Sequence, residues 1–562
     1  MNRQFDAVTV ALTGQLTYIL IVSTILALAA SYLILRLYRR SVLKSMQRRS
    51  RSDLLEAKGY LPPEPELPPH EAPLEFTFVT RQAAAKGAAA KLYRTALRRQ
   101  WLAGAVQIVA GCAFAAAMTA AFFLSSKLPV YPFSFMYFTW AHAWPVLIAL
   151  DAVAWISRRA KRIGSAIYLA IGVALGAVLL ARSPGVTLAE ALYIWLDLNA
   201  IPTLLLLIFL NRRIRAVGPL VLIFMILGVT GATLAATFTG AHPKLLKAFG
   251  DFSHTVGLGP RGALGALHLF GFLVFAAAGW ALLEILHSLY VRKYLSEQSI
   301  TIDAVWLLFG IVNSIGLVFE GRRWILSGLG AFVVYQLIAA GLLRALGTAR
   351  RARSAGPRLL LLRVFALGKR SERLYDALGK FWRAVGSIQM IAGPDLATSA
   401  IEPHEFLDFV SGRLARRFID SGGALDLRLD RLDLKPDGEG QFRVTEFFCH
   451  DDMWKLTLAR LAGESDAVLM DLRGFGAANA GCVFEIHEIF ELVPLARAVF
   501  AVDQSTDQDF MRRTMRQAWR QIKERSPNRR LAAGQVALVD LSQSATGTQD
   551  LLYAVSAAAA EK

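Results

Sequence analysis

The chain has 562 residues with a hydrophobic share of 55% and a mean hydropathy of +0.42, which excludes an ordinary water-soluble protein. A charged share of 19% equally excludes a chain that lies wholly in lipid, so we expect two unlike parts. The formal net charge of +19 does not indicate nucleic-acid binding, because residues 357–562 hold 27 Lys and Arg against 28 Asp and Glu. The basic excess therefore belongs to residues 1–356, where it flanks apolar stretches as in cytoplasmic loops of membrane proteins.

The first 356 residues contain nine predominantly apolar stretches, each long enough to cross a bilayer as a helix of about 17 to 25 residues. They lie near 16–35, 102–124, 134–156, 165–181, 188–210, 217–238, 263–286, 303–319 and 324–343. The stretch near 16–35 lacks a small-residue cleavage site, which favours an anchor over a signal peptide. We therefore predict a polytopic helical membrane domain over residues 1–356, in contact with the lipid bilayer.

Lys and Arg gather in alternate connecting loops, and such loops resist translocation across the membrane. The loops after the first, third, fifth, seventh and ninth stretches are basic, for example Arg158, Arg159, Lys161 and Arg162. The other loops are sparse in basic residues, and the contrast weakens only at Arg322 and Arg323. We expect an integral protein of the plasma (inner) membrane with its N-terminus outside and its C-terminal domain cytoplasmic.

The first cytoplasmic loop contains a proline-rich segment, YLPPEPELPPHEAP, at residues 60–73. Prolines block helix formation and favour extended polyproline geometry, so a stiff spacer is the expected role and an SH3-type ligand is the alternative. Four ionisable residues lie inside apolar stretches, where charge is costly: Asp151, Asp197, His268 and Glu284. Asp151 and Glu284 are near the ends of their stretches, which interfacial positions explain.

Asp197 lies deeper in its stretch than those two, with Asn199 and Pro202 nearby. Polar groups at such depth either line a cavity, as in transporters with broken helices, or form a hydrogen bond between helices. No repeat of the spans is visible in the sequence, which disfavours a transporter with a cytoplasmic regulatory domain without removing that alternative.

The pattern changes after residue 356 to short apolar runs that alternate with helical periodicity. Strands are predicted at 359–365, 387–392, 441–447, 467–471, 498–502 and 535–541. Helices are predicted at 371–385, 403–419, 453–462, 483–492 and 508–523, with a Gly/Asp-rich stretch at 422–440. Continuously apolar short strands between helices indicate a cytoplasmic α/β domain over residues 357–562, with a parallel sheet covered by helices on both faces.

Polar residues follow several of these strands, and ligands bind beyond the carboxyl ends of strands in such sheets. Candidate ligand-binding residues are Asp395, Asp471, Arg473, Asn479, Cys482 and Asp503. The alternative for each Asp is a helix cap or a turn. The run Cys449-His450-Asp451-Asp452 is too short for all four side chains to reach one metal ion, and Cys112, Cys449 and Cys482 are scattered, so we predict no metal site. The sequence has no GxxxxGK[ST] motif, and no GxGxxG follows the first predicted strand, which disfavours ordinary P-loop and Rossmann cofactor sites.

The segment DLRGFGAANAGCVFEI, residues 471–486, consists of a strand, a short loop and Cys-x-x-Glu at the start of a helix. It resembles the corresponding segment of TIR domains, and the order of elements over most of 357–503 is similar to theirs. The resemblance implies a flavodoxin-like fold, and in TIR domains that cleave NAD it implies Glu485 as the catalytic residue, which would hold the nicotinamide ribose while the glycosidic bond breaks. The chain departs from the family in having Ala-Gly before Cys482 and an extra stretch around 420–445.

Three functions follow from these patterns. The first expectation is a membrane-anchored signalling or sensing protein whose cytoplasmic domain binds a nucleotide-like ligand or a partner protein. The second is a TIR-like NAD-cleaving enzyme that uses Glu485, and the third is the transporter with a regulatory domain. The sequence does not identify the cofactor, for which NAD or another nucleotide is considered, and a homo-oligomer is compatible with each function.

Overall fold

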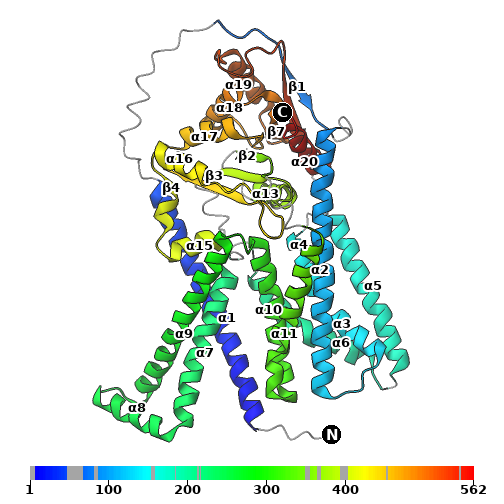
Figure 1. Cartoon of the computed structure of the whole chain (residues 1–562), viewed down its shortest axis with the longest axis vertical. Coiled ribbons are helices and arrows are strands. Elements are labelled where there is room, and N and C mark those ends of the chain that lie inside the picture. The colour runs from blue at the N-terminus through cyan, green and yellow to red at the C-terminus, as the bar shows by residue number, and fades with distance from the viewer. Residues whose placement is uncertain are drawn as a thin grey trace.

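The computed structural model describes residues 7–46, 68–80, 87–153, 158–183, 185–209, 211, 214, 217–347, 355–363, 369–392, 403–450, 453–542 and 546–561. It consists of a bundle of long helices and a parallel sheet with flanking helices, which sits on one end of the bundle (Figure 1). The first helix begins at the end of the bundle farthest from the sheet, and the C-terminal helix lies beside the sheet (Figure 1).

Eight helices among the described residues are long and apolar enough to cross a membrane. They lie in α1 (Ala7–Met46), α2 (Ala88–Ser126), α5 (Arg158–Arg182), α6 (Leu188–Phe209), α7 (Gly218–Ala241), α9 (Pro260–Val291), α10 (Glu297–Leu317) and α11 (Ser327–Ala345), the last two extended by the short 3₁₀ turns η4 (Val318–Glu320) and η5 (Arg322–Leu326). The predicted span at 134–156 corresponds to a pair of helices, α3 (Pro132–His142) and α4 (Pro145–Val153), which is bent by 44° and is, taken together, apolar enough to be a ninth, broken span. The break falls before Pro145, which has no N–H to continue the helix and whose ring clashes with the preceding turn.

Pairs of glycines allow neighbouring membrane-type helices to approach closely. A Cβ built on Gly231 of α7 would lie 2.4 Å from the carbonyl oxygen of Gly271 in α9, and Gly310 of α10 meets Gly328 of α11 in the same way. Helix association in lipid relies on close packing rather than on hydrophobic burial, so small residues are expected where two helices cross. A short amphipathic helix, α8 (Pro243–Thr255), joins α7 to α9 at the end of the bundle farthest from the sheet (Figure 1).

Within the described residues, eight parallel strands form the sheet, in the order β1-β8-β7-β6-β2-β3-β5-β4. Their bounds are β1 (Leu74–Phe78), β2 (Arg358–Arg363), β3 (Ser387–Ala392), β4 (Phe418–Ile419), β5 (Val444–Cys449), β6 (Ala467–Asp471), β7 (Ala498–Val502) and β8 (Gly534–Asp540). The predicted strands at 387–392, 467–471 and 498–502 have these bounds in the structure. Strong hydrophobic runs of strand length were therefore a reliable signal.

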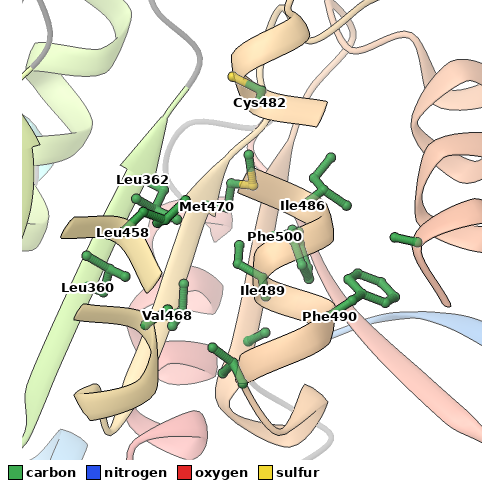
Figure 2. Packing of buried hydrophobic residues seen from close by; sticks show 14 of the residues in the cluster. Leu360, Leu362, Leu458, Val468, Met470, Cys482, Ile486, Ile489, Phe490 and Phe500 are labelled. Atoms are coloured by element: carbon green, nitrogen blue, oxygen red, sulfur yellow. The ribbon is translucent and has the colours of Figure 1, made fainter. Parts of the chain in front are cut away.

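Helices cover both faces of the sheet, so neighbouring strand residues enter different cores. Leu360, Val468 and Phe500 face α17 (Trp454–Glu464), α18 (Ala480–Leu492) and α19 (Gln508–Arg520), and Figure 2 shows this core with Ile486, Ile489 and Phe490 of α18. Leu359, Leu469 and Val499 face the other core, which is built by α13 (Lys369–Trp382), α20 (Thr546–Ala558) and the first turns of α2. Burial on both faces explains why the strands read as continuous apolar runs.

The predicted helix at 403–419 is wrong beyond its first half. The structure has α15 (Pro403–Val410), a 3₁₀ turn η6 (Leu414–Arg417) and β4 in its place. Gly412 has a φ of +70°, and this left-handed conformation ends α15. The following Gly/Asp-rich stretch contains a helix, α16 (Gly422–Asp430), that begins with Ser421 as its N-cap.

Strand β1 comes from the loop between α1 and α2, so the boundary at residue 357 does not separate the two parts of the chain. It pairs in parallel with β8 from Leu74 opposite Gly534 to Phe78 opposite Leu538. Trp519 of α19 donates a hydrogen bond to the carbonyl oxygen of Ala72 at 2.6 Å. The part of the proline-rich segment at 68–73 thus leads into an edge strand, where prolines before the strand cost no ladder hydrogen bond, while 60–67 lies outside the described residues.

Two helices continue beyond the length that a bilayer needs and pack against the α/β half. Helix α2 has 39 residues, about 58 Å, compared with about 30 Å for the hydrocarbon core. Its early residues Tyr93 and Ala96 are buried against Phe381 of α13 and Tyr553 of α20. The last turns of α1 likewise bury Tyr38, Val42 and Met46 against β4 and β5. The two halves are therefore connected by continuous helices rather than by linkers alone.

Candidate functional site

The candidate site lies where the strand order reverses. In the sheet, β3, β5 and β4 lie in this order on one side of the central strand β2, and β6, β7, β8 and β1 lie on the other. The carboxyl ends of β2 and β6 are adjacent, with Arg363 opposite Asp471. In open α/β sheets, the crevice outside the carboxyl ends at this point is the usual place for a ligand.

Asp471 ends β6 and is fully buried in a two-point contact with Arg473. The guanidinium donates from Nε to Oδ1 at 2.8 Å and from Nη2 to Oδ2 at 2.6 Å, and the backbone N–H of Arg473 also donates to Oδ1. A bidentate pair of this kind fixes both planar groups. Asp471 and Arg473 therefore hold each other in a fixed orientation. Both oxygens of the Asp471 carboxylate already accept hydrogen bonds from Arg473.

Glu485 lies in the second turn of α18 with only 4% of its surface exposed. Its Oε2 atom is buried without a hydrogen-bond partner among the described residues. Burial raises the pKa of Glu485 to about 8, although the positive charge of Arg363 acts in the opposite direction. The carboxyl group is consequently mostly protonated at neutral pH, and it has unused hydrogen-bonding capacity inside the protein.

Cys482 precedes Glu485 by almost one turn and is also buried, with Sγ 3.8 Å from the carbonyl oxygen of Arg363. The guanidinium of Arg363 in turn lies over the ring of Tyr375 in α13, 5.5 Å from its centroid. Sequence reasoning missed Arg363 and Tyr375. The only local signal was an arginine that ends an otherwise apolar strand, since its electrostatic interaction with Glu485 depends on the pairing of β2 with β6.

The remaining predicted residues form turns. Asp503 accepts hydrogen bonds from the backbone N–H of Ser505 at 2.8 Å and from its hydroxyl, as a turn-forming aspartate does. Asn479 accepts a hydrogen bond from the backbone N–H of Gly476 at 2.9 Å and precedes the first residue of α18. Asp503 still interacts electrostatically with Arg473. Asp395, the last of the predicted ligand-binding residues, lies outside the described residues.

The two intramembrane candidates do not form one site. Asn199 is buried and donates hydrogen bonds to the carbonyl oxygens of Ala141 at 3.1 Å and Trp195 at 3.0 Å, so it links α6 to α3. Asp197 is exposed on the outer face of α6 and has no hydrogen bond or ion pair within the described part of the chain. Asn199 thus has the structural role that was the alternative, and Asp197 remains unexplained by the fold.

A contact region that the sequence did not predict joins the α/β half to the start of α10. The segment before β5 contacts the residues around the start of α10. Lys293 pairs with Asp433 at 2.8 Å, and Ser296 donates a hydrogen bond to Glu439 Oε2 at 2.9 Å. Burial, followed by the nearby Asp437 carboxylate, raises the pKa of Glu439 to about 7. A cavity of about 40 Å³ beside Glu439 is lined by α2 and α11, which is room for a few water molecules.

The Cys449-His450 pair does not suggest a metal centre. His450 Nδ1 contacts the carbonyl oxygen of Ser45 at 2.8 Å, and Cys449 is buried against Thr457. Among the residues that the structure describes, no group of three His, Cys, Asp or Glu side chains could hold a metal ion. What the structure places near the carboxyl ends of β2 and β6 is a buried carboxyl group, Glu485, with Arg363 and the ring of Tyr375. No protein-family model, curated protein or solved structure matches this chain.

Proposed function

We propose that the chain is a membrane-anchored signalling or sensing protein that binds a nucleotide-like ligand in the crevice between the carboxyl ends of β2 and β6. The observation that carries this proposal is Glu485, a buried carboxyl group without a hydrogen-bond partner among the described residues, located where the strand order reverses. Leaving a buried polar atom unpaired is costly, and such atoms cluster at functional sites. A ligand hydroxyl would satisfy Oε2, and Arg363 with Tyr375 supplies a cation and a ring beside it.

The ligand part of the proposal can be tested on the full chain in lipid nanodiscs. Calorimetric titration with a panel of adenine and other nucleotides, including NAD, should give binding at millimolar concentration or below. Glu485→Ala should weaken that binding at least tenfold, whereas Glu488→Gln, one turn later on the same helix, should not. If no nucleotide binds, or if both variants bind like the wild type, the assignment of the crevice is wrong.

NAD cleavage is the second candidate, and the strand order favours it. Strands β3-β2-β6-β7-β8 follow the 2-1-3-4-5 order of flavodoxin-like sheets, with β5 and β4 added beyond β3 and β1 added beyond β8. This order agrees with the resemblance to TIR domains, in which the position of Glu485 is catalytic. Release of nicotinamide from NAD by the wild type but not by Glu485→Gln would establish the activity. NAD binding without release would leave the protein a binder and exclude the enzyme.

The proposed orientation places the N-terminus outside and the α/β half in the cytoplasm of a cell bounded by the inner membrane. The beginning of α1 and the α/β half lie at opposite ends of the helical bundle (Figure 1), and basic residues gather in the loops on the α/β side. Labelling of intact cells with an impermeant maleimide should modify Gly250→Cys in α8 and leave Asp509→Cys in α19 unmodified. The reverse labelling pattern would invert the topology and remove the intracellular role.

A further inference from the structure

Helix α8 (Pro243–Thr255) is amphipathic, and the bundle leaves most of its apolar face uncovered. Four apolar residues recur at intervals of four, three and four residues and therefore lie on one face: Leu245, Phe249, Phe252 and, directly after the helix, Val256. Leu245, Phe252 and Val256 are 45–62% exposed. Ser253 is the buried residue of α8, and Phe249 is half-buried. Helices α7 and α9, which α8 contacts, thus cover one edge of the apolar face and leave the rest exposed.

The opposite face of α8 is polar. Its residues recur at intervals of three, four and three and are all exposed: Lys244, Lys247, Asp251 and His254. Lys244 and Lys247 form no ion pair within the described part of the chain. A helix with bulky apolar residues on one face and lysines on the other is typical of a segment that lies in the plane of a membrane surface.

Local sequence signals define both ends of α8. Pro243 is its first residue, where a missing N–H costs no helical hydrogen bond. At the other end Gly257 has a φ of +75°, and the N–H groups of Gly257 and Leu258 donate to the carbonyl oxygens of His254 at 3.0 Å and Ser253 at 2.9 Å. This is the Schellman arrangement that ends a helix. Isolated helices shorter than about 12 to 15 residues are marginally stable in water, so α8, with 13 residues, needs a partner for its apolar face.

The place of α8 in the bundle brings this face to the boundary between lipid and water. The helix contacts both α7 and α9 and lies across their ends, on the side of the bundle farthest from the sheet (Figure 1). Helix α7 ends at Ala241, two residues before α8 begins, and α9 begins at Pro260, five residues after α8 ends. Because α7 and α9 are long and apolar enough to cross a bilayer, a helix joined so closely to both lies at the height of the lipid headgroups.

We propose that α8 is a membrane-surface helix that binds the phospholipids of the leaflet farthest from the α/β half. Leu245, Phe252 and Val256 enter the upper acyl-chain region, and Lys244 and Lys247 lie among the headgroup phosphates. Lipid thereby supplies the packing that this short helix lacks in water. The inference requires α7 and α9 to cross a membrane. It depends neither on the ligand crevice nor on which side of the membrane is cytoplasmic.

Spin labels on the two faces test the proposal on the full chain in nanodiscs of phosphatidylcholine and phosphatidylglycerol. In a Cys112→Ser background, which removes the exposed native thiol, single variants carry a nitroxide at Phe252→Cys on the apolar face or at Lys247→Cys on the polar face. Power saturation should show the Phe252→Cys label to be at least several-fold more accessible to oxygen, which dissolves in lipid, than to a water-soluble nickel chelate. The Lys247→Cys label should show the opposite preference. Labels at Leu273→Cys, exposed on α9, and Asp509→Cys, exposed on α19, give the reference values for lipid and for water.

Three outcomes of this experiment would overturn the proposal. If both labels prefer the nickel chelate, α8 lies in water. If both prefer oxygen, α8 is immersed in the bilayer core rather than bound at its surface. If the Phe252→Cys label is shielded from both reagents, a protein covers the apolar face in place of lipid.

Hydrogen exchange separates binding to lipid from proximity to it. The double variant Phe252→Glu with Val256→Glu places two charges on the apolar face. It should raise the exchange rates of residues 244–255, corrected for intrinsic rates, at least several-fold in the same nanodiscs, because α8 loses its lipid partner. Asp251→Asn on the polar face is the control and should exchange like the wild type. Equal exchange in the double variant and the wild type would contradict the binding of α8 to lipid.

Discussion

Ser296, the N-cap residue of α10, donates a hydrogen bond to Glu439 Oε2 of the α/β half at 2.9 Å. The same serine accepts a hydrogen bond from the backbone N–H of Ser299, so one side chain both starts a membrane-type helix and anchors the α/β half to it. Asp303, two turns after the cap on the same side of α10, also interacts electrostatically with Glu439. A change in the charge of Glu439 therefore alters interactions with residues of both the helical bundle and the α/β half.

The first prediction concerns pH. The pKa of Glu439 is raised from 4.5 to about 7 by burial and by Asp437, while Arg383 and the hydroxyls of Ser296 and Ser299 oppose the rise. The contact is fully stabilised below pH 4.5, where Glu439 is neutral in both the docked and the undocked state, and it weakens as pH rises towards 7. Hydrogen exchange in residues 433–443, corrected for intrinsic rates, should increase more between pH 5 and 8 in the wild type than in Glu439→Gln.

Asp430→Asn, an exposed position in α16, is the control for that experiment and should retain the pH dependence of the wild type. If Glu439→Gln and the wild type show the same pH dependence of exchange, Glu439 is not the titrating group at this contact.

The second prediction concerns the buried pair at the end of β6. Asp471→Asn removes the two-point charged partner of the buried Arg473 guanidinium, although the electrostatic interaction with Asp503 remains, and breaking a buried pair in this way costs about 3 to 5 kcal/mol of unfolding free energy. Asp426→Asn, which breaks the half-exposed pair with Arg460, should lower the unfolding free energy much less, because solvent screens an exposed pair. The unfolding free energies of both variants can be measured by urea unfolding of the full chain, with the susceptibility of the α/β half to proteolysis as the readout. Equal effects would show that the Asp471–Arg473 pair contributes no more than a surface pair.

The third prediction follows from the pKa of Glu485, which folding raises from 4.5 to about 8 mainly through burial. Between these values the unfolded chain releases a proton that the folded chain retains, so this group lowers stability progressively as pH rises from 4.5 to 8. Glu485→Gln removes the titration and should be more stable than the wild type at pH 8.5 by at least about 1 kcal/mol, one pKa unit being about 1.4 kcal/mol. At pH 5 the gain in stability of Glu485→Gln over the wild type should be smaller. A constant difference across this range would contradict the raised pKa.

The fourth prediction concerns helix packing. A Cβ at Gly310 in α10 would lie 2.9 Å from the backbone of Gly328 in α11, whereas a Cβ at Gly316 on the same helix would meet nothing within 4 Å. Gly310→Ala should therefore destabilise the bundle by about 1 to 3 kcal/mol through overpacking. Gly316→Ala should be neutral or stabilise it by up to about 1 kcal/mol, because alanine is the better helix former. Thermal unfolding in detergent compares the two, and equal melting temperatures would refute the close crossing.

Local patterns predicted what depends on neighbours in sequence. The apolar stretch at 188–210 corresponds to α6, and the runs at 467–471 and 498–502 are β6 and β7, because a strand buried on both faces must be apolar throughout. The expectation of a continuous helix was wrong where one residue overrides a pattern. Pro145 breaks the third span and Gly412 ends α15, although the surrounding residues have helical periodicity. Helix α20 was not predicted from the sequence.

The sequence by itself determined that this protein has a lipid-compatible helical part and a parallel α/β part, since hydrophobic length and periodicity are local properties. Only the tertiary structure decided that residues 74–78 pair with β8, that α1 and α2 extend into the α/β half, and that Arg363 interacts with both Tyr375 and Glu485. These contacts connect residues far apart in the chain. These contacts form only when elements separated by long stretches of chain pack together. A pattern of neighbouring residues therefore cannot predict them.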